Sequence, residues 1–270
     1  MQNKPEGPAA GDSVDSGTHQ NIARTALVMD AIAAASSKGI RFTDVVKVTQ
    51  LNKTVAHRCL AGLVAYGLAL FDSDSARYYL GDRIFAWTAM ARERFEISER
   101  VKSHLDALAE KLEDTIYFVV RRGDFAVCYG RAEGAYPIKT LTLRVGDRRP
   151  LGVGSSSLAI AAALPDNEVQ RLLRDQSAER EAFRFTDAMF VSEVERARND
   201  GYASMDGHLI PGMTGVALAV RDVRGRPVAA VSVAAISNRL EEPRRSEVVA
   251  AIREEVAAIE KQLSHLLADL

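Results

Sequence analysis

The hydrophobic spacing of residues 42–81 predicts, in order, a helix, a turn, a second helix and a β-ribbon. Apolar residues at steps of three and four predict a short helix over residues 43–49 and a longer one over residues 52–66, with a tight turn at Gln50 between them. Two short apolar runs then flank the polar residues 72–75 and predict the ribbon. This order is typical of a winged helix-turn-helix, whose second helix fits the major groove of DNA.

The longer predicted helix has an apolar face and a polar, basic face. The residues expected to pack on a core are Ala56, Cys59, Leu60, Leu63 and Val64. Basic and polar side chains near the start of such a helix read base edges and phosphates. The candidate DNA contacts are therefore Lys53, Thr54, His57 and Arg58 in this helix, Thr43 as the expected N-cap of the short helix, and Arg77 in the wing.

The rest of the chain alternates between helical and strand-like periods. Before the winged motif, a first helix is expected from Asn21 or Thr25 to the break at residues 36–39. After it, helices are predicted over residues 82–95, 98–113, 156–163, 166–174, 191–200 and 243–267. Strands are predicted over residues 115–121, 126–131, 138–143, 216–221 and 228–236.

This pattern predicts the α+β class, with helices against an antiparallel sheet. We expect a disordered tail over residues 1–20, a winged helix-turn-helix domain over 21–81, a linker helix over 82–97, and an effector-binding and oligomerisation domain over 98–270. With 270 residues, 47% of them hydrophobic, the chain is long enough for two cores.

Charge is distributed unevenly between these regions. Residues 21–95 carry ten Lys and Arg against six Asp and Glu, a net charge of +4, whereas residues 96–270 carry 24 against 27, a net charge of −3. This asymmetry suits a DNA-contacting head on a body with another task. Two cysteines and the lack of a membrane-length apolar run or secretory signal favour the cytoplasm.

The candidate chemistry outside the head is one Gly/Ser loop. Residues 152–157 run into an apolar helix, so free backbone N–H groups converge at the helix start and can hold a carboxylate, although an ordinary Ser-capped helix has the same pattern. The sequence contains no recognisable nucleophile–base pair or metal-ligand spacing, so neither catalysis nor a cofactor or metal is expected. Basic pairs such as Arg148 and Arg149 are assigned to solvated faces.

Five segments in this order resemble the IclR-type bacterial transcriptional regulators, and the similarity extends over residues 21–267. They are Leu51-Asn52-Lys53-Thr54-Val55-Ala56-His57-Arg58, Arg77-Tyr78-Tyr79-Leu80-Gly81, Arg149-Pro150-Leu151, Gly201-Tyr202, and Pro227-Val228-Ala229-Ala230-Val231-Ser232-Val233.

The resemblance implies a winged helix-turn-helix, a linker helix and a GAF-like α/β effector domain with a mainly antiparallel sheet. It also implies homodimers, often homotetramers, that bind palindromic double-stranded operator DNA in response to a small carboxylate, with no membrane partner. The residues that match the family's effector contacts are Ile138, Leu141, Ser155, Ser156, Met205, Gly215, Ser232 and Ala234.

Three of these positions depart from relatives that bind very small keto acids. Those relatives have polar groups where this chain has Met205, Gly215 and Ala234, which predicts a roomier, more apolar pocket for an aromatic or larger aliphatic acid. We expect a cytoplasmic, ligand-responsive repressor or activator of a catabolic operon, and not an enzyme. Two alternatives stay open at this point: an enzyme with a fused DNA-binding head, and an architectural DNA-binding oligomer that senses nothing.

Overall fold

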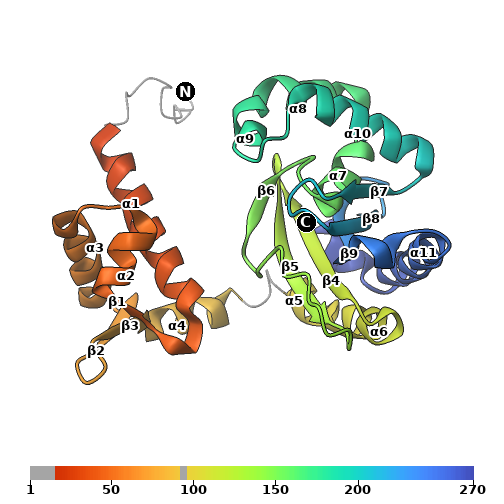
Figure 1. Cartoon of the computed structure of the whole chain (residues 1–270). Coiled ribbons are helices and arrows are strands. Elements are labelled where there is room, and N and C mark those ends of the chain that lie inside the picture. Colours follow the sequence, from red (N-terminus) through yellow and green to blue (C-terminus); the bar gives the residue numbers. More distant parts are fainter. Residues whose placement is uncertain (1–15, 92–95) are drawn as a thin grey trace, which may run out of the picture. The chain divides into compact units, whose positions relative to one another are not determined.

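The computed structural model describes residues 16–91 and 96–270, and the chain divides into two compact units, Met1–Glu93 and Arg94–Leu270 (Figure 1). Most of the expected tail at residues 1–20 lies outside the described residues. So does the end of the expected connector helix, at residues 92–95. Each unit is described by itself below.

The first unit, called the head, contains four described α-helices and a small sheet. Its helices are α1 (Ser16–Ala35), α2 (Phe42–Thr49) and α3 (Lys53–Ala65), followed by α4 (Asp82–Met90), and a short 3-10 helix, η1 (Ser36–Lys38), follows α1. The strands β1 (Ile40–Arg41), β2 (Ala69–Asp72) and β3 (Arg77–Leu80) pair antiparallel in the order β1-β3-β2. The buried core consists of Val28, Ala31, Ile32, Ile40, Val45, Leu60, Leu63 and Ala69.

Helices, turn and ribbon in the head are as predicted, with three differences in detail. Helix α1 begins at Ser16, ahead of the predicted start, because hydrophobic spacing reveals only the part of a helix that packs on a core. Thr43 is not a cap, since α2 has already begun at Phe42 and its N-cap, Arg41, makes no side-chain capping bond. Val64 is 37% exposed and stays off the core.

The second unit, called the effector unit, is a six-stranded antiparallel sheet between helices, with the strand order β6-β5-β4-β9-β8-β7. The strands are β4 (Thr115–Arg122), β5 (Phe125–Glu133), β6 (Arg148–Pro150), β7 (Ala203–Asp206), β8 (Met213–Arg221) and β9 (Pro227–Ile236). The helices are α5 (Glu96–Arg100), α6 (Lys102–Leu112), α7 (Ser155–Ala162), α8 (Asp166–Asp175), α9 (Ser177–Glu181), α10 (Asp187–Asp200), α11 (Arg244–Gln262) and α12 (Ser264–Ala268), with a 3-10 turn, η3 (Ser237–Leu240).

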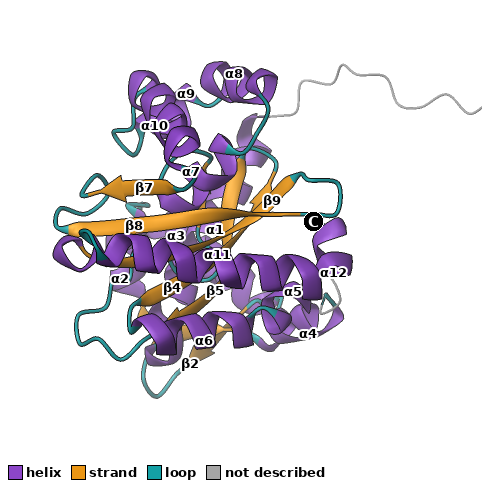
Figure 2. Ribbon diagram, turned by 90° about the vertical axis from the view of Figure 1, so that its right-hand side faces the viewer, coloured by secondary structure: helices purple, strands orange, loops and turns teal. Residues whose placement is uncertain are grey.

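The two faces of this sheet carry side chains of different size. One face packs against α6 and α11 with bulky residues such as Phe118, Val231 and Val233. The other lies under α7 with small residues such as Ala230, Ser232 and Ala234. Figure 2 shows α7 to α10 on one side of β8 and β9, with α6 and α11 on the other. Alternation along each strand therefore separates a packed core from a looser face.

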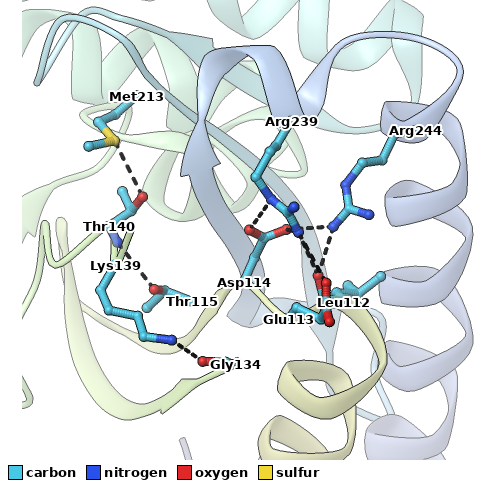
Figure 3. Close-up of polar contacts among 10 residues, drawn as sticks. All are labelled: Leu112, Glu113, Asp114, Thr115, Gly134, Lys139, Thr140, Met213, Arg239 and Arg244. Atoms are coloured by element: carbon cyan, nitrogen blue, oxygen red, sulfur yellow. Dashed lines mark hydrogen bonds and ion pairs between the residues drawn. The ribbon is translucent and has the colours of Figure 1, made fainter. Parts of the chain in front are cut away.

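The predicted strand at residues 138–143 is wrong. This segment is irregular, and its backbone is held by side chains of β4 instead of a ladder (Figure 3). The Thr140 N–H donates to Thr115 Oγ1 at 3.3 Å, and the Thr142 N–H donates to the Tyr117 hydroxyl at 3.1 Å. Because these partners satisfy the buried backbone groups, the segment needs no neighbouring strand. The short elements β6, β7 and α9 were not predicted.

One buried carboxylate ties the end of α6 to the start of α11 (Figure 3). Asp114 is 3% exposed and accepts hydrogen bonds from Arg239 Nε at 2.8 Å and Arg244 Nη2 at 2.7 Å. Both guanidinium groups also donate to the Leu112 carbonyl, which the helix end leaves without an intrahelical partner. The cluster thereby joins α6, η3 and α11.

We predict that Asp114→Ala destabilises the effector unit by about 3 kcal/mol, because it leaves two arginines without their shared counter-ion. Chemical denaturation of the full chain measures this change. Asp106→Ala is the matched control. It removes an equal charge, but from an exposed ion pair between Asp106 and Lys102 within α6. That pair is worth less than about 1 kcal/mol, so equal losses in the two variants would contradict the role assigned to Asp114.

Candidate functional site

The first candidate surface is the exposed face at the start of α3. Asn52 caps this helix by accepting the Val55 N–H at 2.9 Å, and Gln50 takes the left-handed conformation that ends α2. A T-shaped contact between Phe42 and His57, with ring centroids 6.2 Å apart, joins the two helices. All four predicted contacts of α3 are exposed on this surface: Lys53, Thr54, His57 and Arg58. Thr43 is also exposed, in the first turn of α2.

Arg77, the DNA contact predicted in the wing, is hydrogen-bonded within the head. Its Nη1 donates to the carbonyls of Lys38 and Gly39, at 3.2 and 2.8 Å, and the side chain is half-buried. The pairing of Arg41 with Arg77 between β1 and β3 brings this side chain to the end of η1. The Arg77 guanidinium therefore caps the backbone carbonyls at the end of η1. The sequence pattern does not predict this contact, because the two segments are far apart in the chain.

The second candidate site is a cavity between α7 and the small-residue face of the sheet. Its volume is about 50 Å³, counted as the space open to the centres of water molecules. The effector contacts predicted from sequence that line it are Ser155, Ser156, Met205, Gly215, Ser232 and Ala234.

Sheet register explains why residues distant in sequence meet here. Ala234 pairs with Gly215, and Gly215 pairs with Met205, so the three lie in one row across β9, β8 and β7. The neighbouring row joins Tyr117 to Ser232. Antiparallel partners share a face of the sheet, and these rows form the floor of the cavity.

Gly215 does not enlarge the cavity, contrary to the prediction of a roomier pocket. A Cβ on this glycine would lie 2.4 Å from Ser155 Oγ, so the serine side chain fills the space. The space beside Gly215 is thus occupied by Ser155, the first residue of α7. Of the three positions, only Met205 and Ala234 give the cavity its expected apolar character.

The start of α7 is shaped by two glycines with positive φ angles. Gly152 has φ +100° and a Cβ there would lie 2.4 Å from the Phe190 ring, while Gly154, the N-cap, has φ +90°. Other residues adopt such angles with strain. The resulting turn places the first residues of α7 in the lining of the cavity.

The serines at this helix start differ in their bonding. Ser156 and Ser232 are buried, and their hydroxyls are bonded to each other at 2.6 Å. The Ser157 hydroxyl donates to the Gly154 carbonyl at 3.0 Å. Ser155 lines the cavity, and its hydroxyl makes no hydrogen bond to another described residue. Ser155 is therefore the serine that is free to bind a ligand.

Ile138 and Leu141, both predicted as effector contacts, do not line the cavity. They are 50% and 53% exposed, on the outer side of the irregular segment. Thr140, Thr142 and Leu143 line the cavity instead. The Tyr117 hydroxyl fixes this orientation by donating to the Thr140 carbonyl at 2.6 Å while it accepts the Thr142 N–H.

Sequence reasoning missed Arg149. It was assigned to a solvated face, yet it is half-buried and lines the cavity. Burial lowers the pKa of its guanidinium below the usual value, although an arginine remains protonated in proteins. The signal available in the sequence was its place directly before Pro150 and the Gly/Ser loop.

The described residues around the cavity include no His, Cys, Asp or Glu. No cluster of three such residues suited to a metal ion occurs anywhere in the described part of the chain. None of the described helices is long and apolar enough to span a membrane. The arrangement can bind a small molecule, but it offers no general base beside its serines.

Two family models match the chain. The IclR helix-turn-helix domain matches residues 22–73, and the bacterial transcriptional regulator IclR C-terminal domain matches residues 89–261. The HTH-type transcriptional regulator BhcR of Paracoccus denitrificans is 28% identical over 261 residues, covering 93% of this chain and 90% of the relative.

Solved structures have the same fold. The Thermotoga maritima IclR structure has a TM-score of 0.69 at 20% identity and covers 91% of this chain and 99% of its own. An IclR homolog from Microbacterium hydrocarbonoxydans, complexed with 4-hydroxybenzoate, has a TM-score of 0.62 at 20% identity and covers 89% and 98%.

We predict that Gly215→Ala destabilises the chain by about 1–3 kcal/mol, because the new methyl group overlaps Ser155 Oγ. The control is a double-mutant cycle with Ser155→Ala, measured by chemical denaturation. The glycine substitution should cost less in the Ser155→Ala background, and strict additivity would show that the two side chains do not compete for this space.

Proposed function

The chain belongs to the IclR family of bacterial transcriptional regulators, and from this premise we propose that it switches a catabolic operon in response to a small organic acid. It is a transcriptional regulator with a helix-turn-helix domain and an effector-binding domain. The observation that carries the finer proposal is the cavity under α7, which joins a helix start to mainly apolar walls.

The chemistry of the cavity supports an acid with an apolar body. The start of α7 and the Ser155 hydroxyl supply hydrogen-bond donors for a carboxylate. Leu143, Met205 and Leu209 are among the apolar walls that would hold the rest of the molecule. The Microbacterium homolog, with its bound 4-hydroxybenzoate, supports an aromatic acid as one member of this class.

The cavity volume sets a condition on the size of the effector. A cavity that binds benzene has a volume of about 150 Å³. The cavity here has about 50 Å³, so an aromatic acid requires residues 207–212 to move outward. This segment carries Leu209 and Ile210 on the cavity side, and Gly207 and Gly212 at its ends have positive φ angles. We propose the aromatic or larger aliphatic acid with this movement as its requirement.

The head is proposed to bind a palindromic operator as part of a dimer or tetramer. Lys53, Thr54, His57 and Arg58 remain our proposed DNA contacts, because they share the exposed face at the start of α3. A head of net charge +4 gains most of its affinity from two copies on one duplex. Thr43 is retained as a flanking phosphate contact, and Arg77 as a secondary one, because its guanidinium already holds two carbonyls.

Neither alternative function has comparable support. An enzyme would need a base or an activated nucleophile. Cys128, a residue of β5 in the core on the α7 side of the sheet, is not activated, because burial raises the pKa of its thiol to about 11. An architectural protein would need no ligand space between α7 and the sheet, where this chain has a cavity.

A thermal-shift screen of organic acids on the full-length protein tests the proposed effector. An acid supplied at a hundred times its Kd should raise the melting temperature by roughly 5–10 °C. Benzoate-like or longer aliphatic acids are expected to stabilise the protein. Stabilisation by glyoxylate or pyruvate alone would exclude the larger effector, and stabilisation by none of the acids would exclude the class.

Arg58→Ala should weaken binding to an operator selected from random duplexes by about tenfold at roughly 0.15 M salt, since one guanidinium contact to DNA is lost. Fluorescence anisotropy measures the affinity and its salt dependence. Arg253→Ala is the control, because it removes the same charge from an exposed position on α11. If both variants bind as wild type, Arg58 makes no DNA contact.

A further inference from the structure

The effector cavity carries a positive charge, supplied by Arg149. Arg149 is the only charged side chain among the described residues that line it. The guanidinium forms no ion pair within 4.0 Å in the described part of the chain, and the Asp147 carboxylate acts on it only electrostatically. A half-buried and unpaired cation favours an anionic ligand, because burial weakens the solvation that would otherwise stabilise the charge.

The Arg149 side chain is held in place beside the start of α7. Arg149 Nη2 donates to the Thr142 carbonyl at 2.5 Å, which holds the group from one side. Its Nη1 lies 3.0 Å from the point that a Cβ on Gly154 would occupy, directly beside the start of α7. A side chain on Gly154 would thus displace the guanidinium from this place.

The remaining donors of Arg149 are uncommitted. Neither Nη1 nor Nε makes a hydrogen bond to another described residue, and the Ser155 hydroxyl beside them is equally free. An N–H group of a charged guanidinium forms a strong hydrogen bond with a carboxylate, which gives both affinity and orientation. The cavity therefore has unused donors of two kinds at one end and apolar walls at the other.

We propose that Arg149 is the specificity-determining residue of the effector cavity, which selects a carboxylate over a neutral molecule of the same shape. This inference rests on the proposed function, since it deepens the account of the same cavity. Arg149 binds the carboxylate end through Nη1, Ser155 contributes its hydroxyl, and the apolar walls hold the remainder. A neutral amide of the same shape places an NH₂ group where the guanidinium offers only donors, so it is rejected.

Acids paired with their neutral amides test this selectivity on the full-length protein. The probes are benzoate and benzamide, butyrate and butyramide, and pyruvate and pyruvamide, with affinities measured by isothermal titration calorimetry. Wild type should bind at least one acid and prefer it to its amide by about tenfold or more. Arg149→Gln should weaken acid binding by at least about tenfold and bring acid and amide to similar affinities.

Arg148→Gln is the matched control. It removes the same charge from the neighbouring residue, which is exposed and stacks on the Phe125 ring at 3.7 Å. This variant should keep the wild-type affinity and preference. Arg149→Lys, which retains the charge without the planar fork, should keep the preference for acids but bind them more weakly. The Arg149→Lys variant also tests the inference if Arg149→Gln does not fold.

The outcomes separate this inference from the proposed function. Acid binding by wild type together with unchanged binding by Arg149→Gln, or by Arg149→Lys if only that variant folds, would overturn the role of Arg149 and leave the organic-acid effector intact. Equal affinity of wild type for an acid and its amide would overturn the selection of charge. If wild type binds none of the acids, the proposed effector class fails, and the inference fails with it.

Discussion

The effector unit depends on how closely α7 approaches the sheet. The strand residues beneath the helix are small, and at Gly215 the approach is so close that Ser155 fills the place of a side chain. The opposite face, where Phe118 and Val231 pack against α6 and α11, supplies the bulky core that carries much of the stability. One sheet can therefore have a tightly packed face and a face with a cavity. Because successive side chains along a strand point to opposite faces, each strand contributes to both.

Regular elements were predictable where a single periodicity extends over many residues. The helices of the head, the exposed polar face of α3 and the two long hairpins follow directly from the spacing of apolar residues, which reflects burial on one face. Most residues of the cavity floor were predicted only from the family resemblance. Met205, Gly215 and Ala234 are brought together by sheet register, which local sequence does not encode.

The errors have a common physical origin. The segment at residues 138–143 has strand-like alternation, but side chains of Thr115 and Tyr117 bond its backbone from 25 residues away in the chain. Arg77 and Arg149 look like surface charges in sequence, yet Arg77 donates to the Gly39 carbonyl, 38 residues away, and Arg149 donates to the Thr142 carbonyl, seven residues away. Bonds from a side chain to the backbone leave no periodic trace in the sequence, so the sites that depend on them emerge only in three dimensions.

The irregular segment that carries Thr140 and Thr142 also has a consequence for how such regulators diversify. A strand in this place would be bound to its neighbours residue by residue, so that a single insertion would shift every side chain to the wrong face. This segment is anchored at Thr140 and Thr142 by the side chains of Thr115, Tyr117 and Arg149, while Ile138 and Leu141 are exposed. A wall of the cavity can thus accumulate substitutions at its exposed positions while the sheet that supports it stays the same.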